Sequence, residues 1–495
     1  MLINIYQMLN KLIFSFAIIL CFTACKRDFF AESGPGSLQF SNDTIVFDTV
    51  FTSVGTITKT LKVYNRNDNP ITISSIALAN ANSKGVYRLN VDGISGTSAR
   101  DIKIAANDSI FIFVEATINP VDGNLPFLVT DSLLFYTNDK TQDVDLVAYG
   151  QNANFYTPQE NLFFSKDNND TIIYKYYSIK ENTNWDNEIP HVIYGFVIVE
   201  PEATLTIEAG AQIFMHKNSG IIVGNPLIEE NGGTLKVMGE YTNEVNFQGD
   251  RLESWYEDVA GQWDRIWFTP GSKDNEVNYA IINNGTVGLH LDSIFDNNPT
   301  LNVKNTIIKN MSDIGILAQG SHVIGENNVV TDCGRYSVVL NIGGKYDFKH
   351  CTFANYWSYS SRSTASILLN NFYEDINGTI QLRHLTQANF TNCILSGSLT
   401  HEIDLQKDNS ADFNYNFNHC LLKIHPDTNL SSFNQNNSIK IVNNQSVFID
   451  IQDDNYELSE ISPAINTGTE TDVTMDLLNE ARVGPPDMGA YEKID

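Results

Sequence analysis

The sequence has few cysteines and few basic residues. Six cysteines are spread over 495 residues, and two of them are Cys21 and Cys25. This number is too small and too scattered for a disulfide-rich scaffold. Lysine and arginine total 31 against 59 acidic residues, which gives a formal net charge of −28. Such a surface repels nucleic acid and anionic lipid, so neither is an expected partner of the surface as a whole.

The sequence does contain a repeat of six residues, with the order apolar, any, Asn or His (once Tyr), small, and then an apolar pair. Copies occupy 277–282, 303–308, 348–353, 390–395 and 417–422, with a weaker copy at 325–330. Their starts differ by 26, 22, 23, 42 and 27 residues. A period in the twenties indicates a solenoid in which each coil buries its face against its neighbours. The interval of 42 is close to two periods and predicts a degenerate or inserted coil.

The composition of the repeat favours strands and tight turns over helices. A straight strand would place the two apolar ends of the unit on opposite faces. If both point inward, the backbone bends between them, and the Asn or His stacks on its copies at about 4.8 Å. Cys351, Cys393 and Cys420 occupy the small position, with Cys351 and Cys393 expected two coils apart. A buried small side chain explains these cysteines better than a metal or redox site does. The acidic residues show no EF-hand spacing. We therefore expect no metal and no cofactor.

The repeat resembles that of the right-handed parallel β-helix family, the pectate-lyase-like superfold. A second resemblance concerns Ser-Pro-Ala-Ile-Asn-Thr-Gly at 462–468 and Pro-Asp-Met-Gly-Ala-Tyr-Glu at 486–492, which are similar to the closing segment of secreted bacterial β-helix proteins. Together they imply a β-helix over 191–452, with room for roughly ten or eleven coils. They also imply that 453–495 end the solenoid. The resemblance implies a fold and no particular activity.

The N-terminus resembles the signal of a bacterial lipoprotein. Lys11 precedes the apolar run 12–21, and small residues precede Cys25. A charged start, a short apolar core and small residues before the cut are typical of a secretory signal. The resemblance implies that 1–25 are a lipoprotein signal peptide whose cleavage leaves a lipidated Cys25 as the new N-terminus. This Cys25 would hold the chain in the outer membrane, facing the periplasm or the exterior. Met8 is a second candidate start, and the alternatives are a plain signal peptide or an uncleaved anchor.

The remaining segments are assigned to domains and linkers from their predicted strands and from the turn-forming residues between these strands. Residues 26–36 are predicted to form a tether. Residues 37–154 alternate short apolar runs with turn signals and predict a β-sandwich that resembles immunoglobulin-like modules, without the Cys–Trp–Cys core of antibody domains. Residues 155–190 are predicted to be a linker or N-terminal cap. The predicted fold class is all-β, an immunoglobulin-like sandwich followed by a right-handed parallel β-helix, and a monomer is expected.

The candidate ligand-binding residues are aromatic side chains, with one arginine, in two loops: Tyr356, Trp357, Tyr359, Arg362, Trp255 and Tyr256. An insertion in a repeat forms a loop on one face of the solenoid. Aromatic rings there would stack on sugar rings while an arginine holds their hydroxyls or acids. The alternative is that the rings cover the side of the solenoid. At least one of Trp263 and Trp267, in the next strand, is expected in the core.

No set of catalytic residues is apparent. A glycoside hydrolase needs a carboxylic acid and a second carboxylate, and the one pair of adjacent aspartates, Asp453-Asp454, stands alone at the closing segment. A uronate lyase needs a basic residue as base, for which the candidates are Lys345, Arg362, Arg383 and Lys407, with no acidic cluster beside them. His350 and His419 take the Asn position of the repeat, which favours a structural role. We therefore expect a non-catalytic, lipid-anchored envelope protein that binds or scaffolds glycan; the alternative is a polysaccharide lyase or glycoside hydrolase.

Overall fold

The computed structural model describes residues 37–494, except 52–54, 57, 81–84, 119–126, 138–139, 168–169, 227–231, 293–297, 376 and 442–445. The predicted signal peptide, tether and Cys25 lie outside the described residues. Among the residues described, no helix is both long enough and apolar enough to cross a membrane. The chain forms two compact units, one of Met1–Asn119 and Phe127–Gly150, the other of Pro120–Pro126 and Gln151–Asp495.

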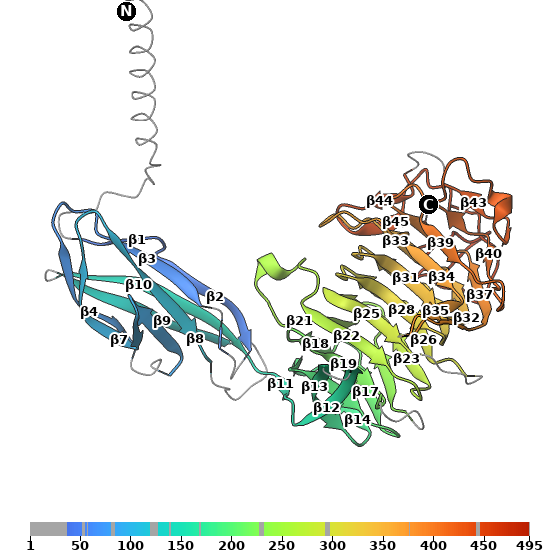
Figure 1. The fold of residues 1–495 in the computed structure, drawn as a ribbon. Helices are drawn as coiled ribbons and strands as arrows, with labels where there is room; N and C mark the ends of the chain where they lie inside the picture. Colours follow the sequence, from blue (N-terminus) through green and yellow to red (C-terminus); the bar gives the residue numbers. More distant parts are fainter. Residues whose placement is uncertain are drawn as a thin grey trace, which may run out of the picture. The chain divides into compact units, whose positions relative to one another are not determined.

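The first unit is a sandwich of two five-stranded sheets, ordered β1-β3-β8-β5-β6 and β2-β10-β9-β4-β7 (Figure 1). The strands are β1 (Gln39–Phe40), β2 (Thr44–Phe51), β3 (Lys59–Tyr64), β4 (Ile71–Leu78), β5 (Tyr87–Val91), β6 (Ile94–Gly96), β7 (Ser98–Ile104), β8 (Ser109–Ala116), β9 (Phe127–Thr137) and β10 (Lys140–Gln151). Side chains alternate between faces, as in β8, where Ile112 is buried and Phe111 is exposed. One core joins residues of both sheets. The likeness to immunoglobulin-like modules stays a prediction.

The second unit is a parallel β-helix of three long sheets, which confirms the predicted fold class of this part of the chain. Sheet 1 contains β11 (Asn154–Tyr156), β15 (His191–Ile193), β18 (Gln212–Met215), β21 (Val245–Gly249), β24 (Ala280–Asn283), β27 (Ile307–Lys309), β30 (Val329–Thr331), β33 (Thr352–Asn355), β38 (Ile394–Gly397), β41 (Leu421–Leu422) and β43 (Ile439–Lys440). Sheet 2 contains β12 (Glu160–Asp167), β13 (Asp170–Ile179), β16 (Phe196–Val199), β19 (Gly220–Val223), β22 (Trp263–Phe268), β25 (Gly285–Leu291), β28 (Ile314–Gln319), β31 (Tyr336–Asn341), β34 (Ile367–Asn370) and β39 (Ile403–Gln406). Sheet 3 contains β14 (Thr183–Trp185), β17 (Thr204–Glu208), β20 (Thr234–Met238), β23 (Asn275–Asn278), β26 (Leu301–Lys304), β29 (His322–Glu326), β32 (Gly344–Lys349), β37 (Leu385–Thr391), β40 (Asn416–Asn418) and β42 (Gln435–Asn436).

The six-residue repeat forms the bend from sheet 3 to sheet 1, as its spacing predicts. The residue at its Asn or His position adopts left-handed φ, for example 49° at Asn305, 52° at His350 and 54° at Asn392. Asn tolerates this conformation better than most residues. Copies on neighbouring coils are hydrogen-bonded, since Asn327 Nδ2 donates to Asn305 Oδ1 at 3.0 Å. The predicted stack of polar side chains is confirmed.

The coil predicted inside the interval of 42 residues is absent. Lys349 pairs with Thr391 and Thr352 pairs with Ile394, so these two copies of the repeat lie on adjacent coils. The extra length is taken up by a loop at 356–366 and by a hairpin of β35 (Phe372–Glu374) and β36 (Ile380–Leu382). Cys351 and Cys393 are therefore buried free thiols on neighbouring coils, and the expected separation of two coils was wrong.

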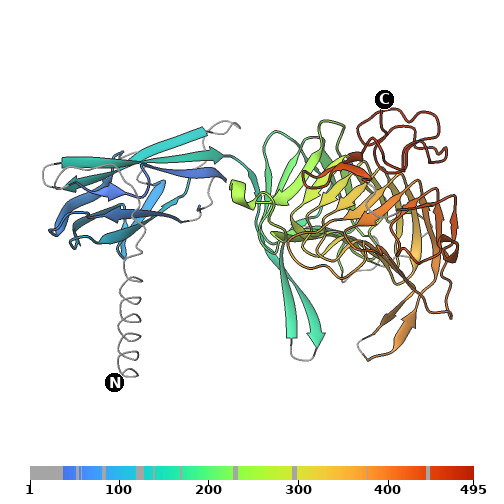
Figure 2. The ribbon, with the colours of Figure 1, turned by 90° about the horizontal axis from the view of Figure 1, so that it is seen from above.

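Residues 155–190 supply the first coil. Its strands β11, β13 and β14 pair in parallel with β15, β16 and β17. Strand β12 then pairs antiparallel with β13, which covers the outer edge of sheet 2. Figure 2 shows this hairpin, and the β35–β36 hairpin, extending away from the coils.

The C-terminal segment follows the last coil in the sequence but packs along the side of the solenoid. Outward-facing side chains of sheet 1, including Val329 and Ile394, form one apolar cluster with Phe448 and Met488. Within the segment, Asp487 Oδ1 accepts a hydrogen bond from the backbone N–H of Asn466 at 2.6 Å. The motif that resembles a closing segment therefore stabilises a cover over sheet 1.

Candidate functional site

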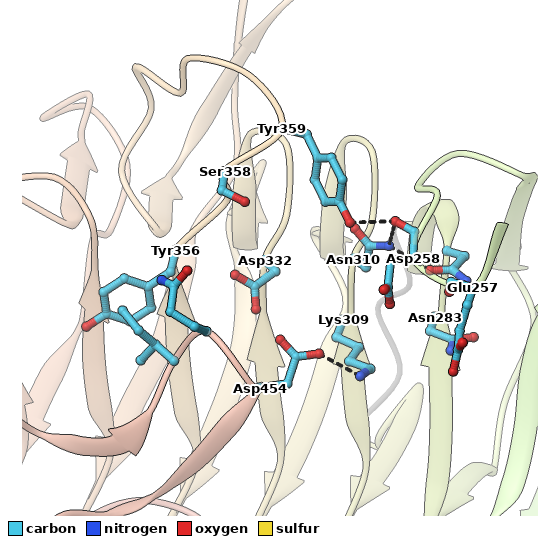
Figure 3. A pocket seen from close by; sticks show the side chains of 13 residues that line it. Glu257, Asp258, Asn283, Lys309, Asn310, Asp332, Tyr356, Ser358, Tyr359 and Asp454 are labelled. Carbon is cyan, nitrogen blue, oxygen red and sulfur yellow. Dashed lines mark hydrogen bonds and ion pairs between the residues drawn. The ribbon is translucent and has the colours of Figure 1, made fainter. Parts of the chain in front are cut away.

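A pocket of about 250 Å³ lies at the corner where the chain turns from sheet 1 into sheet 2. Three successive coils make short turns here, after β24, β27 and β30. The coils on either side carry long loops at this corner, 250–262 after β21 and 356–366 after β33. The short turns form the floor of the pocket and the loops form its walls. The pocket is lined by Glu257, Asp258, Asn283, Asn284, Lys309, Asn310, Asp332, Tyr356, Ser358, Tyr359, Ile451, Gln452 and Asp454 (Figure 3).

The floor is a ladder of three residues, Asn284, Asn310 and Asp332, on neighbouring coils. The register of the strands just before them, with Asn283 opposite Lys309 and Lys309 opposite Thr331, places them on adjacent rungs. All three have left-handed φ, of 64°, 54° and 50°. Asn310 Nδ2 donates to Asn284 Oδ1 at 2.7 Å, so the amide of the second rung reaches the first.

The third rung departs from this pattern because an aspartate stands where an asparagine would donate. Asn310 Oδ1 is buried and accepts no hydrogen bond from the described residues. A protonated Asp332 would donate to that oxygen, whereas an ionised one offers only acceptors. Tyr456 Oη already donates to Asp332 Oδ2 at 2.6 Å. Burial raises the pKa of the Asp332 carboxyl, and the charge of Asp454 raises it further. The hydrogen bond from Tyr456 lowers this pKa, and the net shift is upward.

A second carboxyl group faces Asp332 from the C-terminal segment. Asp454 lies in the turn between β44 (Phe448–Asp450) and β45 (Asn455–Leu458), and its side chain points towards Asp332 (Figure 3). Lys309 Nζ lies 2.7 Å from Asp454 Oδ2. The side chain of Asp454 is 44% exposed. The pocket thus holds one buried carboxyl group, that of Asp332, and one exposed carboxyl group that is paired with a lysine.

The two loops that form the walls are joined to each other and to the floor. Tyr359 Oη donates to the backbone carbonyl of Asp258 at 2.7 Å. Asn310 Nδ2 donates to the same carbonyl at 2.7 Å, and Asn284 Nδ2 donates to the carbonyl of Glu257 at 2.7 Å. The structure therefore brings together the two loops that the sequence identified separately.

The predicted aromatic residues take different places around this pocket. Tyr359 is 59% exposed and lines it. Tyr356 lines it as well, but its ring also packs on Phe448, with 6.3 Å between centroids. Trp357 supports Tyr359 from behind, with centroids 5.0 Å apart. Trp255, 63% exposed, lies beside the lining residues, in the same loop as Asp258.

Two further aromatic predictions concern loop 250–262 and the strand after it. The Tyr256 ring lies 4.4 Å from that of Trp255 in a tilted arrangement, and Arg251 lies 4.0 Å above the Tyr256 ring. Of the two tryptophans in β22, Trp263 is 1% exposed in the core, which confirms that expectation. Trp267 lies on the outer face of sheet 2 and stacks on His290 at 5.5 Å.

Arg362 lies outside the pocket and has a structural environment. Its guanidinium is paired with both carboxylate oxygens of Glu402, at 2.9 and 2.7 Å, and the two side chains are 1% and 0% exposed. Arg362 Nη2 also donates to the backbone carbonyl of Asn355 at 2.7 Å. The guanidinium therefore anchors loop 356–366 and is not presented to a ligand. None of the other predicted bases, Lys345, Arg383 and Lys407, lines the pocket.

The predicted structural role of His350 agrees with its surroundings. Its Nε2 accepts from Asn392 Nδ2 at 2.8 Å, which extends the ladder at the other corner of the coil. Burial, with a contribution from the charge of Arg482, lowers the pKa of His350 to about 3. The imidazole is neutral and serves the ladder. No group of three or more potential metal ligands occurs among the described residues.

Sequence reasoning missed Lys309 and Asp332, and it considered Asp454 only as part of an acidic pair. The sequence did contain a signal for the residues that form the floor of the pocket. Asn284, Asn310 and Asp332 each stand two residues after a copy of the repeat, so they share one position of the coil. An acid at a position that otherwise carries asparagine marks a departure from the structural pattern.

Comparisons with known proteins give the fold only. A scan for protein families and a search of curated proteins found no match. Similar solved structures include pectate lyase Pel9A, at 12% identity and a TM-score of 0.29 over 64% of this chain and 86% of that chain. A GH87 α-1,3-glucanase catalytic unit from Streptomyces thermodiastaticus matches at 11% identity and a TM-score of 0.26 over 77% and 75%. A family 123 glycoside hydrolase from Clostridium perfringens, at 9% identity and a TM-score of 0.18, is matched over 24% of this chain and only 30% of its own length. At these TM-scores the likenesses carry no argument about activity.

Proposed function

We propose that this chain binds a neutral polysaccharide in the corner pocket. The observation that carries the proposal is the joining of two aromatic loops over a floor of hydrogen-bonding side chains, through the contact of Tyr359 with Asp258. Sugar rings offer an apolar face to aromatic side chains and hydroxyls to amides and carboxylates, and such mixed sites fix the orientation of a ligand. We propose that the protein acts in the bacterial cell envelope, anchored by lipid on Cys25.

The charge of the pocket argues for a neutral ligand. Four acidic residues line it against one basic residue, Lys309, which is already paired with Asp454. A uronate carboxylate entering this pocket would meet repulsion, with no unpaired cation among the lining residues to neutralise it. The charge therefore disfavours a uronate lyase.

Hydrolysis of a glycosidic bond is the second candidate function. Asp332 and Asp454 supply two facing carboxyl groups with different surroundings: Asp332 is buried, which raises its pKa, and Asp454 is exposed and paired with Lys309. Glycoside hydrolases use two carboxyl groups in different roles, because one protonates the leaving oxygen while the other attacks or activates water.

Affinity gel electrophoresis tests the proposal. Dextran, α-1,3-glucan, laminarin, xylan and mannan would each be cast in native gels beside polygalacturonate. We expect retardation by at least one neutral polymer and none by polygalacturonate. Loss of retardation in Tyr359→Ala, with retention in Tyr241→Phe at an exposed tyrosine outside the pocket, would support the site; retardation by polygalacturonate alone would contradict it. New reducing ends that disappear in Asp332→Asn would establish the second candidate.

A further inference from the structure

A second hollow lies on the other side of loop 356–366. It has a volume of about 480 Å³, and its lining includes Tyr336, Thr364, His401, Asp404, Leu405 and Phe433. The hollow opens on the outer face of sheet 2, at its last strands β31 and β39. No residue of this hollow lines the corner pocket.

One loop forms a wall of both hollows. Ser358 and Tyr359 line the corner pocket, whereas Thr364 lines the second hollow. Between them lies Arg362, whose buried pairing with Glu402 fixes the middle of the loop. The residue before Glu402 is His401, which lines the second hollow, so the same ion pair also fixes the wall opposite the loop. The loop, held by this ion pair, therefore contributes residues to both hollows.

The second hollow offers the groups that a sugar ring requires. Tyr336 and Phe433 are half-buried aromatic residues in its lining. Asp404 supplies a carboxylate, one oxygen of which accepts from Gln406 Nε2 at 2.7 Å. His401 Nδ1 accepts from the backbone N–H of His425 at 3.1 Å, so in the neutral ring the proton is on Nε2, which is a donor. Rings, a donor and an acceptor in one hollow suit a ligand with an apolar face and hydroxyls.

We propose that the second hollow is a further carbohydrate subsite and that one neutral glycan chain crosses loop 356–366 to occupy both sites. This inference rests on the proposed function of the corner pocket. Asp404, like the acids of the corner pocket, disfavours an anionic chain. Two subsites joined by one ligand make the second binding event intramolecular, so affinity rises steeply once the glycan is long enough to reach both.

Isothermal titration of the full chain with disaccharides and octasaccharides tests the inference. Both probes would come from partial hydrolysis of whichever of the five neutral polymers retards the protein. We expect the octasaccharide to bind at least about ten-fold more tightly than the disaccharide. The variant Tyr336→Ala/Asp404→Ala should lose this advantage and keep its affinity for the disaccharide, whereas Tyr359→Ala should lose the disaccharide. Circular dichroism would establish that each variant keeps its β-structure.

The possible failures are distinguishable. An octasaccharide advantage that survives in Tyr336→Ala/Asp404→Ala, or no such advantage in the wild type, would overturn the second subsite and leave the corner pocket intact. Binding of neither probe by the wild type would overturn the proposed function together with the inference.

Discussion

The hydroxyl of Tyr359 donates a 2.7 Å hydrogen bond to the backbone carbonyl of Asp258, a residue 101 positions earlier in the chain. Both residues lie in insertions at the same corner of the solenoid, and the coils between them make only short turns. A single contact therefore closes the gap between two loops and gives the corner pocket its second wall.

Removal of the Tyr359 hydroxyl should loosen loop 250–262. Tyr359→Phe deletes one hydrogen bond worth about 1 kcal/mol, which makes opening of the loop about five-fold more favourable. Hydrogen–deuterium exchange followed by mass spectrometry should show faster exchange in peptides that cover 250–262. The control Tyr241→Phe removes a hydroxyl from a 43% exposed ring and should leave these peptides unchanged. Equal exchange in all three proteins would mean that the contact does not hold the loop.

The variant Asp332→Asn should remove a pH-dependent loss of stability. Burial and the charge of Asp454 raise the pKa of Asp332 in the folded chain, while Lys309 and Tyr456 act in the opposite direction. Between the ordinary carboxyl pKa of about 4 and the raised value, the folded state holds a proton that the unfolded state has lost. The free energy of unfolding of the wild type therefore falls as pH rises, by at most about 1.4 kcal/mol per pH unit from this group. Asparagine can donate to Asn310 Oδ1 at any pH.

Urea unfolding at pH 4, 6 and 8 measures this difference. Asp332→Asn should match the wild type at the lowest pH and be more stable at the highest. Asp453→Asn, at an exposed neighbouring acid, provides the control and should follow the wild type. A variant that loses stability most at pH 8 would show that Asp332 is needed in its ionised form.

Substitution of Arg362 should reduce the stability of the folded chain. Arg362→Met leaves the Glu402 carboxylate buried without its partner, which costs about 3–5 kcal/mol. The double variant Arg362→Met/Glu402→Leu removes both charges and should recover most of that loss. Thermal unfolding of the wild type and the two variants gives the comparison. A double variant no more stable than the single one would show that the ion pair is not the source of the effect.

The repeat predicts much of this architecture, because each copy encodes a bend with an apolar residue on both sides and an Asn or His in left-handed conformation. It did not predict the adjacency of His350 and Asn392. The 42 residues from one copy to the next include a loop and a hairpin, and their combined length is close to that of one further coil. The candidate site was partly predictable, because the repeat also shows where insertions interrupt the coils. Tyr359 and Trp255 stand out as aromatic residues in insertions, whereas Asp454 reaches Asp332 only because the C-terminal segment folds back along sheet 1.

Two ion pairs of the C-terminal segment, one within it and one with the coils, should differ strongly in their contribution to stability. Arg482 is paired with Glu492 at 3.2 Å, with side chains 3% and 2% exposed, and its Nη2 donates to Asn327 Oδ1 at 2.9 Å. Lys349 and Asp472 also lie close together, but the Asp472 side chain is 73% exposed. Arg482→Met leaves a buried carboxylate unpaired and should lower the free energy of unfolding by about 3 kcal/mol or more.

Asp472→Asn is the matched control for this comparison, because it breaks a solvent-exposed pair on the same segment and should cost less than about 1 kcal/mol. Both variants would be measured by urea unfolding and by binding of a fluorescent apolar dye. Release of the segment in Arg482→Met would uncover the outward side chains of sheet 1, such as Val329 and Ile394, and should increase dye fluorescence below the unfolding midpoint. Equal losses of stability in the two variants, with no rise in dye fluorescence, would mean that apolar packing alone holds the segment in place.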